Sequence, residues 1–80
     1  MTYSVSIQDV FGEWSLSGVF LHRQQALKEA RRMEFRLGAP RTVVYEVNGV
    51  GDDRIIYDSR KDSIMFDHST LKWTIIHIKK

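Results

Sequence analysis

The stretch HRQQALKEARRMEFRLGAP, residues 22–40, decides the fold, because it is a helical pattern lying between segments that alternate like strands. Its apolar residues recur at three- and four-residue intervals, as they do on one side of a helix. They are Ala26, Ala30, Met33 and Leu37, with Leu27 beside them. Gly38 followed by Pro40 is a strong stop signal. The sequence predicts a helix over residues 23–37 whose start has no clear capping residue.

The chain before this helix has the period of a half-buried hairpin. Tyr3, Val5 and Ile7 alternate with polar residues, and QDVFGE supplies a turn. Residues 3–8 are therefore expected to pair with residues 13–20. Gly18 interrupts the second strand, which indicates a bulge or a close backbone approach.

The chain after the helix contains a second hairpin, residues 43–47 against 55–57, around a loop at residues 48–53. Residues 61–69 fit either a strand or an irregular connection. Residues 70–78 read as a strong strand whose second half is apolar on both sides, which suggests a central strand or an interface. Trp73, in its middle, is expected in the core.

These segments predict one domain over residues 1–80, in the order ββαβββ, or ββαββ if residues 61–69 form no strand. Parallel pairing needs a crossover of about a dozen residues or more, and only the helix supplies one. The predicted fold is therefore α+β, with a mainly antiparallel four- to five-stranded sheet and one helix packed on one face.

Composition excludes several classes of protein. The 80 residues include no cysteine, so neither a disulfide nor a thiolate metal site can form. The first residues have no basic region followed by an apolar run, and no stretch is long enough to span a membrane. The net charge of +2 is below the bias of a dedicated nucleic-acid binder. We expect a cytoplasmic protein.

Residues with catalytic or metal-binding chemistry are present, but not in the spacing that such chemistry needs. His22, His68 and His77 have no second ligand at a helical metal spacing. The aspartates lack the ligand pattern of a calcium loop. No serine lies in a nucleophile elbow, and NGVGDD at residues 48–53 has no lysine for a phosphate. We therefore predict no catalytic residue, no metal and no cofactor, and a protein that is not an enzyme.

The outer side of the predicted helix carries a row of cations. Lys28, Arg32 and Arg36 follow one another at four-residue steps, where like charges repel. Arg31 and Phe35 lie close to this row. One interpretation is a solvated face, whose repulsion Glu29 and Glu34 partly offset. The other is a partner-binding surface, since arginine is enriched at interfaces and an exposed phenylalanine can anchor a partner. The predicted partner-binding residues are Lys28, Arg31, Arg32, Phe35 and Arg36.

The first third of the chain resembles several small families in its β-β-α pattern. The residues are YSVSIQ, followed by GEWSLSGVFLHRQQALKEA. HicB-type antitoxin domains, the arm-binding domains of phage integrases and small phage proteins share this pattern. The arm-binding pattern has three strands before its helix, and the antitoxin pattern has a longer segment between hairpin and helix. The resemblance implies a protein of phage or mobile-element type and assigns no role to any residue.

The sequence as a whole favours a small non-catalytic binding domain whose partner is a protein. The alternative is a nucleic-acid-binding protein that uses the basic outer face of the helix. A homodimer is a further expectation, because Ile76 and Ile78 lie on the strand face opposite Trp73 and need cover, either from residues 64–66 or from a second copy of the chain.

Overall fold

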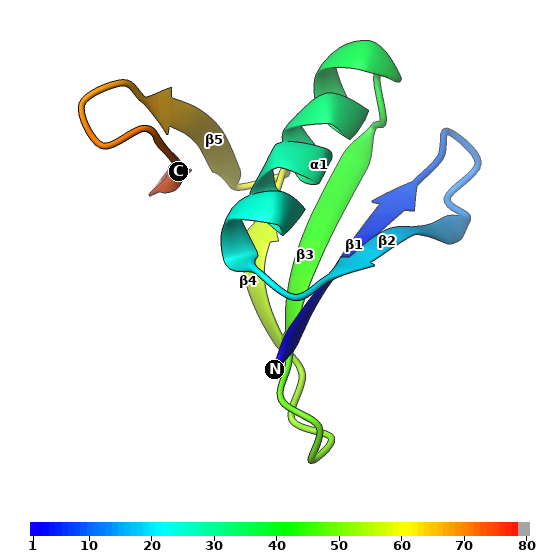
Figure 1. Cartoon of the computed structure of the whole chain (residues 1–80). Coiled ribbons are helices and arrows are strands. Elements are labelled where there is room, and N and C mark those ends of the chain that lie inside the picture. The colour runs from blue at the N-terminus through cyan, green and yellow to red at the C-terminus, as the bar shows by residue number, and fades with distance from the viewer. Residues whose placement is uncertain (79–80) are drawn as a thin grey trace.

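The computed structural model, which describes residues 1–78, has one helix and six strands in the predicted order ββαβββ (Figure 1). The elements are β1 (Thr2–Gln8), β2 (Trp14–Phe20), α1 (Arg23–Arg36), β3 (Arg41–Val47), β4 (Arg54–Asp58), β5 (Asp62–Asp67) and β6 (Lys72–His77). Both predicted hairpins and the helix are confirmed. The α+β class follows.

The strands form two sheets, not one. Four of them make an antiparallel sheet in the order β2-β1-β3-β4, and β5 pairs with β6 in a separate two-stranded sheet. The chain leaves the larger sheet after Asp58, at a turn closed by the Lys61 amide donating to the Asp58 carbonyl at 3.0 Å. Of the two alternatives for residues 70–78, the central strand is wrong, because within residues 1–78 β6 pairs with β5 alone, and the interface stays a prediction.

The core lies between the larger sheet and the helix. Val5, Val44 and Tyr57 occupy one row across β1, β3 and β4 and face the buried side chains of Ala26, Leu27 and Ala30. Ile64 of β5 and, less deeply, Ile75 of β6 join the same cluster. The small hairpin therefore packs on the same side of the sheet as the helix, as Figure 1 shows for β5.

Both ends of α1 match their sequence signals. His22 precedes the helix with extended backbone and makes no capping hydrogen bond through its side chain, as the missing cap residue predicted. At the other end Gly38 has φ of 62°, a left-handed conformation that glycine adopts without strain. The Ala39 amide then donates to the Met33 carbonyl at 3.2 Å and closes the helix.

Gly18 lies at a bulge, which is one of the two alternatives that its position suggested. The pairing of β1 with β2 shifts register between Val5 and Ser6, opposite Gly18, which marks a bulge. A Cβ atom on Gly18 would lie 2.9 Å from two ring carbons of Phe20. A larger residue there would have to displace a ring that packs against the core.

Trp73 departs from its predicted position. The sequence placed it in the core, whereas the structure leaves it half-buried, packed against the edge of the core cluster. Its ring contacts the Phe66 ring edge to face, with centroids 5.1 Å apart. The difference arises because β6 belongs to the small hairpin beside the helix, and every residue of β6 remains at least partly exposed to solvent.

Within residues 1–78, no helix is long enough and apolar enough to cross a membrane.

Candidate functional site

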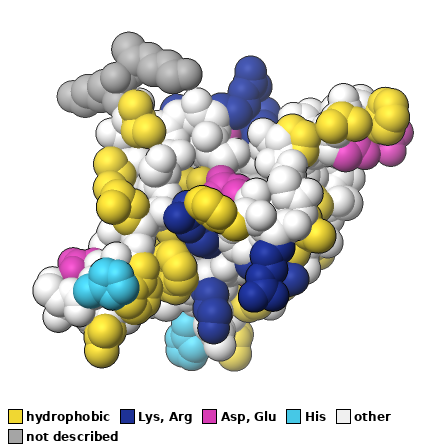
Figure 2. All heavy atoms as spheres, turned by 90° about the horizontal axis from the view of Figure 1, so that it is seen from above, with side chains coloured by type: hydrophobic (Ala, Val, Ile, Leu, Met, Phe, Trp, Pro, Cys, Tyr) yellow, Lys and Arg dark blue, Asp and Glu magenta, His cyan; other side chains and the backbone are white. Residues whose placement is uncertain are grey.

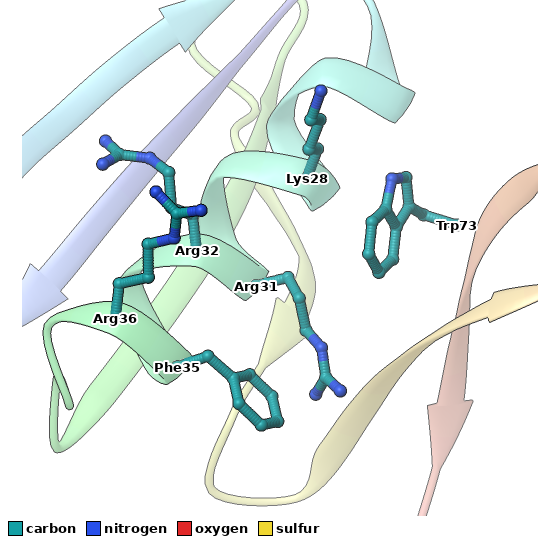
Figure 3. A pocket seen from close by; sticks show the side chains of 6 residues that line it. All are labelled: Lys28, Arg31, Arg32, Phe35, Arg36 and Trp73. Atoms are coloured by element: carbon teal, nitrogen blue, oxygen red, sulfur yellow. The ribbon is translucent and has the colours of Figure 1, made fainter.

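The predicted partner-binding residues surround one hollow on the surface. Its volume is about 430 Å³, and β6 contributes its far wall through Trp73 (Figure 3). The helix contributes all the other lining residues, namely Lys28, Arg31, Arg32, Phe35 and Arg36. We call this hollow and its six lining residues the helix groove. A volume of this size is at the lower end of the range for ligand-binding pockets.

The position of Trp73 is fixed by a glutamine of the helix. The Gln24 side chain donates to the Trp73 carbonyl at 2.9 Å and accepts from the Trp73 amide at 2.6 Å. One side-chain amide thus satisfies both backbone groups of Trp73, as a neighbouring strand would. This pair of hydrogen bonds joins β6 to the first turn of α1 and sets the width of the groove.

Arg32 is the most neutralised of the groove cations. Its Nε and Nη2 atoms donate to the two Glu29 carboxylate oxygens at 2.7 and 3.0 Å. Ser17 of β2 donates to the same carboxylate at 2.8 Å. The hydrogen bond from Arg32 is the main reason why the pKa of Glu29 is lowered. The row of cations therefore repels less than its spacing alone suggests.

Phe35 and Arg31 form a stacked pair in the groove. The Arg31 guanidinium carbon lies 3.5 Å from the centroid of the Phe35 ring, a cation–π contact. The Phe35 residue is nevertheless 67% exposed, although it is a large apolar side chain. Figure 3 shows that Arg31 and Phe35 both project toward the space between the helix and β6. The stack holds the ring in one orientation and leaves much of it in contact with solvent.

Lys28 and Arg36 are two exposed cations of the groove. Within residues 1–78 neither has an ion-pair partner, and both are exposed. Lys28 and Arg32 also line a second hollow of about 290 Å³ on the side of the helix toward Phe20. Figure 2 shows Lys and Arg side chains interspersed with hydrophobic ones on the upper face of the molecule.

A buried polar contact supports the helix from below. The Tyr57 hydroxyl donates to a Glu34 carboxylate oxygen. Desolvation of the carboxylate raises the pKa of Glu34, and burial raises the pKa of Tyr57. This contact ties the helix to β4 below the groove, and it is not part of the lining.

The histidines and aspartates hold no metal-binding cluster within residues 1–78. His77 Nδ1 lies 2.7 Å from Asp62, whose other carboxylate oxygen accepts the Asp58 amide at 3.0 Å. Asp67 accepts from the amide and hydroxyl of Ser69, so it stabilises the turn of the β5–β6 hairpin. These groups therefore have structural partners.

Sequence reasoning found the helical wall of the groove and missed the opposite wall. The five helical residues follow from the period of α1, but Trp73 and Gln24 are joined across 49 positions of the chain. The sequence signal for the opposite wall was that residues 70–78 are apolar on both faces. This pattern did not indicate that the helix would lie beside Trp73. No protein-family model, no curated protein and no solved structure matches the chain, so the functional argument rests on this geometry.

Proposed function

We propose that the chain is a non-catalytic binding domain whose helix groove takes a protein segment that combines acidic residues with one large apolar side chain. The observation that carries the proposal is the composition of the groove, in which two aromatic rings from different elements face a hollow rimmed by cations. The partially exposed rings of Phe35 and Trp73 supply apolar contact. Lys28 and Arg36 supply charge for carboxylates.

The long cationic side chains support the same assignment. Lysine and arginine bury their aliphatic stems along apolar surface and hold the charged end in water. The groove therefore has an apolar floor with positive charge at its rim. An apolar anchor with acidic neighbours would satisfy both parts, and arginine and aromatic residues are the usual centres of binding energy at interfaces. We also propose that the protein acts in the cytoplasm, which the absence of cysteine supports.

The alternative function, nucleic-acid binding, has one observation in its favour. Exposed aromatic rings beside arginines can stack on unpaired bases. Against it, Arg32 is already paired with Glu29, so within residues 1–78 the groove cations without an ion pair are Lys28, Arg31 and Arg36. Three phosphate contacts would give a slope of log affinity against log salt of only about 2–2.7. A dedicated single-strand binder needs a broader footprint.

The first prediction concerns the charge of the groove. Lys28→Gln/Arg36→Gln should weaken binding of peptides selected from a displayed random library against the wild-type chain by roughly 5–30-fold, because each rim contact contributes about 0.5–1 kcal/mol. Phe35→Ala should weaken binding by roughly 30-fold or more, as expected of a central aromatic anchor. Fluorescence anisotropy with labelled peptides measures both effects.

The matched control removes two cations outside the groove. Arg60→Gln/Lys61→Gln changes the net charge by the same amount at two exposed residues of the β4–β5 turn, and it should leave affinity unchanged within about twofold. Equal losses in the two double variants would contradict the groove as the binding site. A labelled oligothymidylate that binds more tightly than the peptides, with a salt slope of about 4 or steeper, would support the nucleic-acid alternative instead.

A further inference from the structure

On the outer face of the four-stranded sheet, small polar side chains lie beside larger apolar ones. The core residues Val5, Val44 and Tyr57 point toward the helix, so the alternate residues of each strand point to the opposite face. On β1 these residues are Ser4 and Ser6. Ser4 lies between Val19 of β2 and Tyr45 of β3.

In the next row Ser6 lies between Leu16 and Val43, but Val43 is only 1% exposed, so this row is apolar and open to solvent on the β2 side alone. The outer face therefore has a serine groove along β1, flanked by an apolar ridge on β2 and by the partly exposed Tyr45 on β3. The β2 ridge is open to solvent, with Leu16 62% and Val19 57% exposed, and Ile55 beside Tyr45 on β4 is 47% exposed. Within residues 1–78 the helix and the small hairpin both pack on the other face.

The charges on this face cancel one another. Arg41 donates to Asp58 through two nitrogens, at 3.2 and 2.7 Å, and its guanidinium carbon lies 5.1 Å from the centroid of the Trp14 ring. A second copy of the face would therefore meet no uncompensated charge. The helix groove, in contrast, is cationic, and two grooves would repel. Self-association is thus favoured through the sheet and not through the helix.

We infer that the outer sheet face binds a second copy of this chain in a two-fold homodimer. A two-fold axis that runs along the strands between β1 and β3 places Tyr45 of each copy over the serine groove of the other. The same axis places β2 of each copy over β4 of the other, so all four strands take part. Such a contact is isologous, the commonest form of oligomer interface.

The size of the face is sufficient for a specific dimer. Four strands about 4.8 Å apart, three of 7 residues and one of 5 at about 3.3 Å per residue, project roughly 400 Å². Side chains that stand out from the sheet raise this to roughly 500 Å² of accessible surface per copy, so the pair buries about 1,000 Å², the lower limit for a specific interface. Both helix grooves would remain on the outside of the dimer, and the dimer does not depend on what the grooves bind.

The test is sedimentation velocity at concentrations from about 1 µM to 1 mM. The wild-type chain should become dimeric within this range, and Val19→Lys should weaken the dimer by roughly tenfold or more, because it buries an unpaired charge. Val50→Lys is the matched control, since Val50 is 79% exposed in the β3–β4 loop, away from the face. It should dimerise like the wild type.

Circular dichroism must show that each variant is folded, and Leu16→Lys replaces Val19→Lys if the latter is not. A wild-type chain that stays monomeric at 1 mM would overturn the inference. So would a dimer that survives Val19→Lys and Leu16→Lys, or one that Ile76→Lys alone disrupts. The last result would place self-association on the small hairpin, where Ile76 is 43% and Ile78 49% exposed.

Discussion

Leu27→Ala should lower the free energy of unfolding by about 2–5 kcal/mol, the range for removing a buried leucine side chain. Leu27 is 1% exposed and belongs to the core cluster with Val5 and Val44. A chain of 80 residues has a free energy of unfolding of roughly 4–12 kcal/mol. The substitution should therefore remove a large part of the free energy of unfolding. Urea denaturation followed by circular dichroism measures this change.

Leu37→Ala is the matched control for this prediction. Leu37 ends the same helix but is 64% exposed, so the same substitution should cost less than about 0.5 kcal/mol. Leucine and alanine have similar helix propensities, which removes that difference from the comparison. If Leu27→Ala cost no more than Leu37→Ala, the helix would not cover the sheet in the way described.

Arg41→Met should lower the free energy of unfolding by about 2–3 kcal/mol at pH 7, because it removes two charge-assisted hydrogen bonds from a carboxylate that is almost buried. The Asp58 side chain is 9% exposed, and Arg41 is the main reason why its pKa is lowered from 3.8. A carboxylate with a lowered pKa contributes stability above its unfolded pKa. This contribution is lost as the pH falls through the folded pKa.

The pH dependence distinguishes this contact from ordinary packing. The difference between Arg41→Met and the wild type should be constant from about pH 7 to 5 and should disappear only as the pH falls through the folded pKa of Asp58, which lies below its ordinary value of 3.8. Arg54→Met is the control, since the Arg54 side chain is 70% exposed and pairs with Glu46 at 3.0 Å. It should cost less than about 1 kcal/mol. Equal costs at pH 7, or a difference as large at pH 2 as at pH 7, would contradict this role of Arg41.

The positions of the helix and strands along the chain could be predicted more fully than their arrangement in space. The helix and both larger hairpins could be predicted because hydrophobic period, turn residues and the Gly38 stop signal all agree. Residues 61–69 fit either a strand or an irregular connection from sequence alone, since aspartates at both ends of what forms β5 interrupt the apolar alternation. The structure gives those aspartates local roles, with Asp62 accepting the Asp58 amide and Asp67 bonded to Ser69.

The candidate site was half predictable for a similar reason. A helical period shows which residues share a face, so the cationic row and Phe35 follow from sequence. The place of Trp73 depends on the turn after Asp58, which directs the chain away from the larger sheet, and on the two hydrogen bonds of Gln24. The serine groove likewise needs the strand order β2-β1-β3, because sequence period cannot show which strands are neighbours.

The most direct test of the binding proposal uses the two tryptophans of the chain, one on each surface. Trp73 lines the helix groove, and Trp14 lies with Arg41 on the outer sheet face. In ¹H–¹⁵N spectra, titration with the library-selected peptides should shift the Trp73 indole signal and leave the Trp14 indole signal in place. The selected peptides should be acidic, with one large apolar residue. Peptides without acidic residues, or a shift of Trp14 while Trp73 stays unchanged, would contradict the account.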